Sequence, residues 1–243
     1  MSEAAFAQTE TTTAANTPGA EGSLGATVIA PHPGLWRSRR SRDGGPLGGW
    51  TKRTFDVVLA FGALVFLAPL LGLIWLAVRL ECGGDPIFKQ ERGGFGGRTF
   101  RIFKFRTMVC AENGAQVRQV QAGDERITRL GAFLRQTSWD ELPQLFNVLR
   151  GDMSLIGPRP HATQHDRDFA AVDPSYSVRF LARPGITGLA QVSGCRGPTE
   201  TSDKIRARTS YDVQYVAEWS VMSDLRIVLR TLLLAAKRDT GAI

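Results

Sequence analysis

The sequence predicts an α/β domain, mostly α-helical, that is attached to a membrane by an apolar helix near its N-terminus. The run from Val57 to Val78 carries no formal charge. At ~1.5 Å per residue an α-helix over this run would be roughly 33 Å long, about the thickness of the hydrocarbon layer of a bilayer. Two segments rich in β-branched and aromatic residues follow it, PIFKQ and RTFRIFKFRTM, and the remaining periodicity is mainly helical.

Composition supports one domain with a substantial core. The chain has 243 residues, of which 43% are hydrophobic and 22% charged, and these fractions exclude a disordered protein and a small disulfide scaffold. The net charge of +7 favours anionic partners such as nucleic acid, nucleotide, phosphate or lipid headgroup. The cysteines, Cys82, Cys110 and Cys195, have unrelated spacings, which indicates reduced thiols on the cytoplasmic side.

Residues 1–50 read as a disordered tail that ends in basic residues. They are rich in Gly, Ala, Thr, Ser and Pro, and such a segment buries too little apolar surface to offset its ordering entropy. It is not a secretory signal, because the apolar run begins too late in the chain. The predicted organisation is therefore a tail over 1–50, a membrane helix over 51–80, and a domain over 81–243 that ends in amphipathic helices.

The membrane helix is predicted to bend or break at Pro69. Proline lacks a backbone donor and clashes with the preceding turn. Basic residues flank the apolar run on both sides, from Arg37 to Arg53 and from Arg79 to Arg98. The positive-inside rule would put both ends in the cytoplasm, as in a re-entrant helix. Composition alone leaves an ordinary kinked span equally open.

The first segments after the membrane helix predict a hairpin and two helices. The two β-rich segments flank the turn GGFGG, which is typical of a hairpin. Residues 111–125 are polar and predict a loop or a short helix. Helices are predicted over 128–135 and over 140–150, with Gly151 placed to end the second. The apolar residues of this second helix share one predicted face: Leu142, Leu145, Phe146 and Leu149.

The later segments predict turns, one short strand and more helix. The stretch GDMSLIGPRP is rich in turn residues, 176–182 is predicted helical, and RPGITGLAQVSG is predicted as a loop with a short strand. Residues 204–237 are predicted to be largely helical. Their last part mixes Trp and aliphatic residues with Arg and Lys, which suits an amphipathic helix at a membrane interface. Ordinary core packing explains this pattern nearly as well.

Asp140 and Glu141 are the main candidates for chemistry. An acidic residue in a first helical turn is stabilised in its ionised form, which suits a carboxylate nucleophile or a metal ligand. Neighbouring helical positions point about 100° apart, so the two carboxylates can take different roles in one site. Ser138 and Glu141 also have the S-x-x-E spacing of a capping box, which would make Glu141 structural.

Five cations are candidates for binding phosphate: Lys104, Arg106, Arg135, Arg159 and Arg183. Lys104 and Arg106 alternate with phenylalanines and so share one face of a strand, and Arg159 lies between two prolines in a rigid turn. Guanidinium groups bind phosphate oxygens in bidentate fashion. Mg²⁺ is typically held by one or two carboxylates together with substrate phosphates. The set therefore predicts Mg²⁺ and a diphosphate substrate, although any one of these arginines alone is more often a surface charge or part of a structural ion pair.

Other motifs are weaker. His161 and His165 have helical spacing, but no further ligand completes a zinc site. GGFGG lacks the G-K-[ST] of a P-loop, and no motif for binding nucleic acid accompanies the basic charge. Asp124 and Arg126 precede the predicted helix over 128–135 as a cap with a local ion pair, or as contributors to the site.

The ordered motifs resemble the bacterial sugar transferases, the monotopic polyprenyl-phosphate phosphoglycosyl transferases. The resemblance runs from Lys52 to Arg238, through KRTFD, GDPIFKQERGG, FRIFKFRTM, DERITRLGAFLRQTSWDELPQLFNVLRGDMSLIGPRP and RPGITGLAQVSG. It implies a re-entrant membrane helix broken at Pro69 that holds a small catalytic domain at the cytoplasmic face of the bacterial inner membrane. Some members have Ser–Pro at the break where this chain has Ala68–Pro69.

The resemblance also implies an activity. Members transfer a sugar 1-phosphate from a nucleotide sugar to a polyprenyl phosphate. By this match Asp140 would attack the phosphate next to the sugar and form a covalent phosphoglycosyl-aspartate, while Glu141 would assist and help to place Mg²⁺. Lys104, Arg106, Arg135 and Arg159 match basic positions near the diphosphate and the lipid phosphate.

The C-terminal motifs look like those of hexose-1-phosphate transferases that begin exopolysaccharide or capsule repeat units. Glucose is the first expected sugar and galactose the second. The expected partners are a UDP-sugar, undecaprenyl phosphate and membrane lipid, with a second copy of the chain and downstream glycosyltransferases as further candidates, and no nucleic acid. The alternative readings are a catalytically silent membrane scaffold or regulator of polysaccharide assembly and, on charge alone, a lipid-anchored domain that binds nucleic acid.

Overall fold

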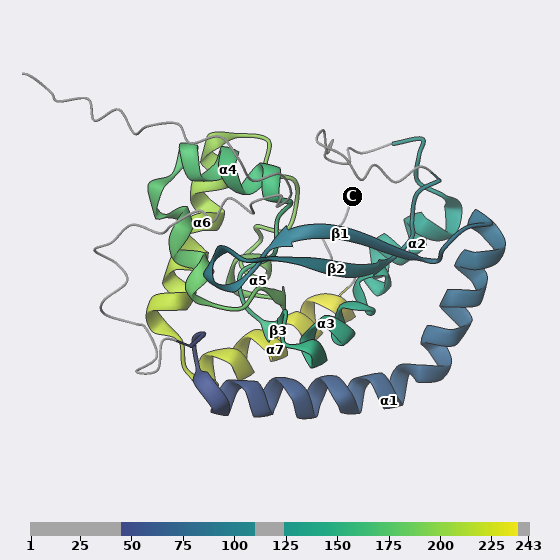
Figure 1. The fold of residues 1–243 in the computed structure, drawn as a ribbon, viewed down its shortest axis with the longest axis horizontal. Coiled ribbons are helices and arrows are strands. Elements are labelled where there is room, and N and C mark those ends of the chain that lie inside the picture. Colours follow the sequence, from purple (N-terminus) through teal and green to yellow (C-terminus); the bar gives the residue numbers. More distant parts are fainter. Residues whose placement is uncertain (1–44, 110–123, 238–243) are drawn as a thin grey trace, which may run out of the picture.

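The computed structural model describes residues 45–109 and 124–237 (Figure 1). Cys110, most of the predicted tail and nearly all of the predicted loop over 111–125 lie outside these residues. The described chain is mostly helical, with one antiparallel and one parallel pair of strands and a long apolar helix at its start. The predicted fold class, α/β and mostly helical, is confirmed.

The long helix α1 (Gly49–Cys82) contains Pro69 and is bent rather than interrupted (Figure 1). The residues predicted a bend or a break at Pro69, and the family resemblance implied a break; the structure shows the bend. A proline inside a helix removes one backbone hydrogen bond and displaces the preceding turn, which bends the helix without ending it. The helix ends instead at Gly83, which has a left-handed φ of 65°.

Most of the apolar surface of α1 is exposed. Within the part of the chain that the structure describes, α1 is the one helix long and apolar enough to cross a membrane, and only 17% of its most apolar stretch is buried. Phe66, for example, is 83% exposed. A core helix of a soluble domain would bury this surface, so the exposure supports association with a membrane.

Polar residues fix the first turns of α1 to the rest of the domain. The Nζ of Lys52 lies 2.6 Å from the Oδ2 of Asp224, and both side chains are buried. Arg53 donates to the backbone oxygens of Val148 and Leu149. The motif KRTFD therefore attaches the start of the apolar helix to the α-helices of the domain.

The predicted hairpin is confirmed. Strand β1 (Ile87–Gly93) pairs antiparallel with β2 (Thr99–Phe105), with Ile87 opposite Phe105 and Gly93 opposite Thr99. The turn contains a short 3-10 helix, η1 (Phe95–Gly97). Gly96 and Gly97 have φ values of 65° and 75°, a region that favours glycine.

A second, separate sheet is a parallel pair of strands. Strand β3 (Ser154–Ile156) pairs with β4 (Gly185–Thr187). The short strand predicted in RPGITGLAQVSG is thus confirmed as β4, whereas β3 falls in a stretch that the sequence predicted as turns. The pairing joins segments about thirty residues apart, and such long-range pairing leaves little local signal.

Helices lie in each of the four segments predicted as helical, over 128–135, 140–150, 176–182 and 204–237, but the helices over 163–172 and 189–192 were not predicted. Thr128 caps α2 by accepting a hydrogen bond from the Gly131 amide, and the long C-terminal helix is divided at Trp219 and Ser220. The bounds are α2 (Arg129–Thr137), η2 (Trp139–Glu141), α3 (Gln144–Arg150), α4 (Thr163–Val172), η3 (Pro174–Leu181), α5 (Leu189–Val192), α6 (Ser202–Glu218) and α7 (Val221–Ala236).

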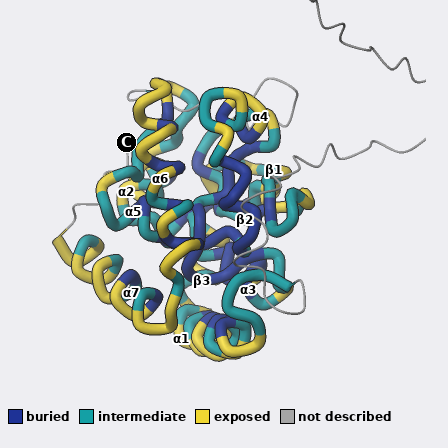
Figure 2. The backbone as a smooth tube through the Cα atoms, turned by 90° about the vertical axis from the view of Figure 1, so that its left-hand side faces the viewer, coloured by how far each residue is buried: buried dark blue, intermediate teal, exposed yellow. Residues whose placement is uncertain are grey.

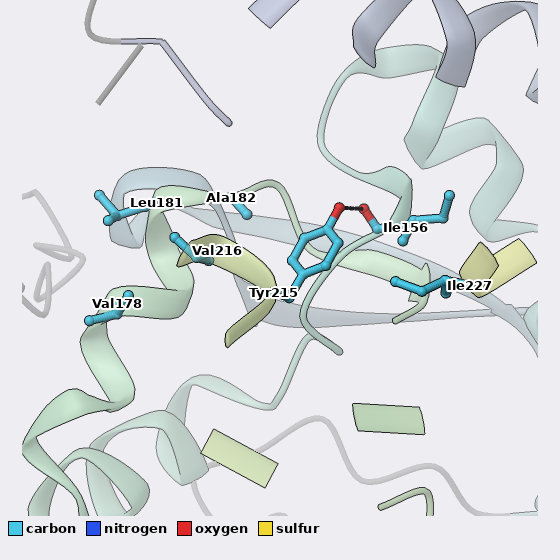
Figure 3. Close-up of a cluster of buried hydrophobic side chains, with 7 residues drawn as sticks. All are labelled: Ile156, Val178, Leu181, Ala182, Tyr215, Val216 and Ile227. Atoms are coloured by element: carbon cyan, nitrogen blue, oxygen red, sulfur yellow. Dashed lines mark hydrogen bonds between the residues drawn. The ribbon is translucent and has the colours of Figure 1, made fainter. Parts of the chain in front are cut away.

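One buried cluster joins β3, η3, α6 and α7 (Figure 3). The hydroxyl of Tyr215 donates to the backbone oxygen of Ile156 at 3.0 Å, so the polar end of this buried ring is satisfied. The outer face of α7 remains apolar and exposed, and Figure 2 places it near α1 at the margin of the molecule. Core packing within the described chain therefore does not account for the apolar residues on this face. The exposed apolar residues of α7 are Val221, Met222, Leu225, Leu229, Leu232 and Leu233.

Substitution Gly185→Ala is expected to destabilise the fold by about 2–3 kcal/mol, because overpacking forces the backbone to shift. A Cβ at Gly185 would lie 2.1 Å from the Gly157 amide nitrogen and 2.4 Å from the Thr187 oxygen. Thermal unfolding in detergent should show a lower Tm for this variant. Gly197→Ala, where a Cβ meets no atom within 4 Å, is the control and should leave Tm unchanged. An equal Tm for both variants would contradict the close approach of β3 and β4.

Candidate active site

The acidic pair lies on η2, the 3-10 turn between α2 and α3. Ser138 ends α2 in a left-handed conformation with a φ of 58°, and the turn begins directly after it. Pro143 then precedes α3, where its fixed φ suits a helix start. The prediction of a single helix over 140–150 is therefore wrong in its first turn, whereas its predicted end at Gly151 is confirmed.

The predicted apolar face of α3 is also wrong in part. Leu145 is buried, but Phe146 is 51% exposed, and the other buried positions include Gln144 and Asn147. The Asn147 side chain accepts from the Phe103 amide and donates to the Arg101 oxygen, so it binds the edge of β2. These hydrogen bonds hold α3, and with it the acidic pair, against the hairpin.

Glu141 is bound by two cations that come from distant segments. Lys104 of β2 lies 2.7 Å from its Oε1, and Arg159 binds both carboxylate oxygens at 2.7 and 3.2 Å. Ser138 makes no side-chain cap hydrogen bond, so the capping-box interpretation of Glu141 is wrong. Burial alone would raise the pKa of Glu141, but Arg159 and Lys104 outweigh it and hold this pKa well below its usual range.

The pKa of Asp140 is raised, whereas that of Glu141 is lowered. It is 7% exposed, and burial raises its pKa to about 6, with Glu141 adding to the shift and Lys104 and Arg135 opposing it. Among the residues that the structure describes, none forms a hydrogen bond or ion pair with its carboxylate. Asp140 is therefore a buried carboxylate without a fixed partner, close to cations that could hold an anionic substrate.

The other predicted cations are placed differently. Arg135 on α2 is near enough to Asp140 to lower its pKa, and its Nε is buried without a hydrogen-bond partner in the described chain. The Nε of Arg106 donates to the Asp85 oxygen at 2.8 Å, and that of Arg183 donates to the Gly151 oxygen at 2.9 Å, at the end of α3. Within 45–109 and 124–237, no hydrogen bond or ion pair joins Arg106 or Arg183 to the acidic pair.

A buried network behind Arg159 was not predicted from the sequence. Arg179 on η3 donates to the backbone oxygen of Arg159 and to the hydroxyl of Tyr176, and lies 3.3 Å from Asp212. His161 binds the same hydroxyl at 2.6 Å. Arg179 stands between Val178 and Phe180, so a cation within a predicted apolar helix was the available signal. The network holds the Pro158–Pro160 loop that carries the Arg159 side chain.

Further arginines surround the site and were also missed. Burial and, next to it, the nearby charge of Arg159 lower the pKa of Arg92 and that of Arg208 to about 10. The pKa of Arg196 is lowered by burial and by Arg159, while Glu141 opposes the shift. Mutually repelling guanidinium groups in a buried region favour binding of an anion such as a diphosphate.

The carboxylate oxygens of Asp140 and Glu141 are suitable ligands for Mg²⁺. Asp140 and Glu141 are neighbouring carboxylates, and hard oxygen ligands of this kind hold Mg²⁺ when substrate phosphates complete the coordination. Within the described ranges no cluster of three or more His, Cys, Asp or Glu residues could hold a metal ion. A metal at this pair would thus depend on ligands from the substrate.

The chain combines an exposed apolar helix with a domain in which a carboxylate pair lies near several buried guanidinium groups. These features define a class of membrane-associated proteins with a site for phosphorylated substrates. The chain belongs to the bacterial sugar transferase family, whose sequence model matches residues 47–238.

Relatives within this class share much of the chain. A UDP-glucose:undecaprenyl-phosphate glucose-1-phosphate transferase of Caulobacter vibrioides is 54% identical over 195 residues, which cover 79% of this chain and 73% of the relative. A protein of the same name from Escherichia coli is 45% identical over 74% of this chain, and the match covers 39% of that relative's length. The exopolysaccharide production protein PSS of Rhizobium leguminosarum is 42% identical over 78% of this chain and 97% of its own.

Proposed function

We propose that this protein transfers glucose 1-phosphate from UDP-glucose to undecaprenyl phosphate and releases UMP, with UDP-galactose as the second candidate donor. The observation that carries the proposal is the buried Asp140 carboxylate, which has no hydrogen-bond or ion-pair partner among the described residues and lies beside Glu141, itself held by Lys104 and Arg159. The names of the relatives from Caulobacter vibrioides and Escherichia coli support the choice of donor and acceptor. Such a reaction would begin an exopolysaccharide or capsule repeat unit, in keeping with the relative from Rhizobium leguminosarum.

The reaction proceeds in two displacements at one phosphorus atom. A carboxylate oxygen of Asp140 attacks the phosphorus next to the sugar, and the bond from this phosphorus to the oxygen bridging to UMP breaks, so that UMP leaves. A phosphate oxygen of the lipid then attacks the same phosphorus, and the bond to Asp140 breaks. The carboxylate is regenerated, and neither step consumes water or requires a net proton.

The surrounding residues stabilise charge during these displacements. Arg159 and Lys104, fixed by Glu141, and Arg135 present cations around Asp140 where negative charge is transferred between oxygens. Asp140 and Glu141 would hold Mg²⁺ together with diphosphate oxygens, and the ion would supply further positive charge there. Arg106 and Arg183 are proposed to act further from the reacting phosphorus, on the lipid phosphate or on the nucleotide.

The helix α1 is proposed to enter and leave the membrane by the cytoplasmic face of the inner membrane. Its first turn is bound to α7 through Lys52 and Asp224, and its last turns pack on the same domain through Ile74 and Val78. A helix whose two ends contact one folded domain is unsuited to spanning a bilayer. The cytoplasmic face also gives the site access to nucleotide sugars.

The proposal is tested by UMP release from protein in nanodiscs that contain undecaprenyl phosphate. With Mg²⁺ and UDP-glucose, we expect UMP and a lipid-linked hexose in equal amounts, and UDP-galactose in a parallel reaction tests the second donor. Folded protein that turns over neither sugar would contradict the proposal and favour a catalytically silent scaffold.

Formation of UMP in the first displacement is expected to depend on pH through Asp140. Only the ionised carboxylate attacks, and burial raises the pKa of Asp140 to about 6. The rate of a single UMP burst without acceptor should therefore level off above about pH 7 and fall about tenfold per unit below pH 6. Rapid-quench measurements between pH 5 and 8 check this without interference from the acceptor phosphate. A burst rate that stays constant down to pH 5 would contradict it.

A further inference from the structure

Arg208 on α6 connects two loops that come from distant parts of the sequence. Its Nη1 lies 3.2 Å from the Nε2 of His161, in the loop that carries Arg159. Its Nη2 donates to the backbone oxygens of Cys195 and Gly197, at 2.9 and 2.5 Å. One buried guanidinium therefore fixes the positions of both loops relative to each other.

The second of these loops holds the backbone of Arg196. Gly194 has a φ of 88°, a left-handed conformation that turns the chain after α5. The amide of Cys195 then donates to the Ala190 oxygen at 2.9 Å. The two oxygens that Arg208 binds belong to the residues on either side of Arg196. The backbone of Arg196 is thus fixed on both sides, whereas its side chain is only half-buried.

The Arg196 guanidinium lies near the ion pair of Arg159 and Glu141. Its pKa is lowered by burial and by the charge of Arg159, while the charge of Glu141 opposes the shift. Interactions between charges weaken with distance, so both groups are near neighbours of Arg196. The three cations with the largest effect on the pKa of Asp140 do not include Arg196. Arg196 is therefore placed beside Arg159, at a greater distance from the Asp140 carboxylate.

The buried charge of Arg208 is unfavourable within the protein alone. Burial and the charges of Arg159 and Arg179 lower the pKa of Arg208 to about 10. Its Nε also has no hydrogen-bond partner within 45–109 and 124–237. A bound anion offsets repulsion between clustered guanidinium groups, and phosphate oxygens bind such groups well. The cluster therefore favours a phosphate close to Arg159 and Arg196.

We infer that Arg196, positioned by Arg208, binds the phosphate that leaves with UMP, an inference that rests on the proposed function. Asp140 attacks the phosphorus next to the sugar, so that phosphate lies beside Asp140. The phosphate linked to uridine lies one bridging oxygen further away, which matches the place of Arg196 beside Arg159. A guanidinium at this place stabilises the negative charge that develops on the departing UMP.

Arg196→Gln is expected to weaken UMP binding at least about tenfold, because a charge-assisted hydrogen bond to phosphate is lost. Calorimetric titration of UMP into the full-length protein in nanodiscs with Mg²⁺ measures this without turnover. The KM for UDP-glucose should rise by a similar factor, and the KM for undecaprenyl phosphate should stay unchanged. Arg206→Gln removes an exposed cation from the same helix as Arg208 and should alter none of the three values.

Arg208→Lys tests whether this arginine acts through Arg196. The ammonium group keeps the charge but cannot bind the two loops at once as the guanidinium does, so UMP affinity should fall several-fold. In the Arg196→Gln background the same substitution should have little further effect, because residues that act through each other are not additive. Equal losses of UMP affinity in both backgrounds would indicate a general structural role and overturn the positioning by Arg208.

The outcomes separate this inference from the proposed function. If the wild-type protein releases UMP and Arg196→Gln binds UMP as tightly as wild type, the assignment of Arg196 is overturned and the proposed function is unaffected. A raised KM for undecaprenyl phosphate with unchanged UMP affinity would also overturn it, since Arg196 would then act on the acceptor. Wild-type protein that binds no UMP would contradict both.

Discussion

Asp140→Asn is expected to lower UMP release by at least ~10³-fold, since removal of a nucleophile abolishes the covalent route. The amide keeps the shape of the side chain but cannot attack phosphorus. The same variant should be more stable than wild type at pH 7. Burial raises the pKa of Asp140 to about 6, above its unfolded value, so the ionised group destabilises the fold at neutral pH.

The gain in stability should be about 1–3 kcal/mol at pH 7, should shrink as the pH falls through about 6, and should vanish below about pH 3, where wild-type Asp140 is protonated in both states. Unfolding in detergent at the two pH values measures it. Asp168→Asn, on the exposed face of α4, is the control and should change neither rate nor stability. An Asp140→Asn protein that keeps most of its activity would show that another group attacks the donor.

Glu141→Gln is expected to lower kcat/KM by about 10²–10³-fold, because charge-assisted bonds to a buried carboxylate contribute several kcal/mol. The amide cannot hold Lys104 and Arg159 as the carboxylate does at 2.7 Å. Both cations would lose their fixed positions near the diphosphate. Steady-state kinetics should show a raised KM for UDP-glucose together with a lowered kcat.

A purely structural Glu141 would behave differently. Loss of a helix cap costs only about 1 kcal/mol of stability and leaves the kinetics of the folded enzyme intact. Glu91→Gln, an exposed position on β1, serves as the matched control and should resemble wild type. Normal kinetics in a folded Glu141→Gln protein would remove Glu141 from the site.

Local sequence signals predicted the elements that local physics determines. The glycines between β1 and β2 and Gly151 after α3 act within a few residues, and both were found, whereas Thr128, which caps α2, was predicted as part of the helix. The apolar run predicted α1 because its length and lack of charge need no tertiary context. Its bend without interruption depends on packing against the domain along its length, which the run itself does not encode.

The sequence predicted which residues belong to the candidate site but not the contacts between them. Asp140 and Glu141 were recognised, but the spacing of Ser138 and Glu141 also fitted a cap. Only the contacts with Lys104 and Arg159, which lie 37 and 18 residues away, decide between the two. Pro143 was the available signal against a continuous helix over 140–150, because proline inside a helix removes a hydrogen bond and clashes with the preceding turn. Its effect is to place the carboxylates on a separate turn rather than on α3.

The buried network of Arg179, Tyr176 and His161 could not be predicted from one sequence. Each residue reads locally as a surface position or a helix residue, and burial of an arginine becomes favourable only when distant carboxylates such as Asp212 and backbone oxygens are assembled around it. The same holds for Arg92 and Arg208. The excess of cations around the acidic pair therefore emerges from the fold and not from any motif.

The measurement that tests the central claim most directly follows the phosphate next to the sugar. UDP-glucose labelled in both the glucose and this phosphate is incubated with the protein, Mg²⁺ and undecaprenyl phosphate, and the nucleotide and lipid products are separated. The account predicts that UMP is released and that both labels reach the lipid in equal amounts. Release of UDP with only the sugar label in the lipid would show transfer of the sugar alone, and would contradict attack by Asp140 on phosphorus.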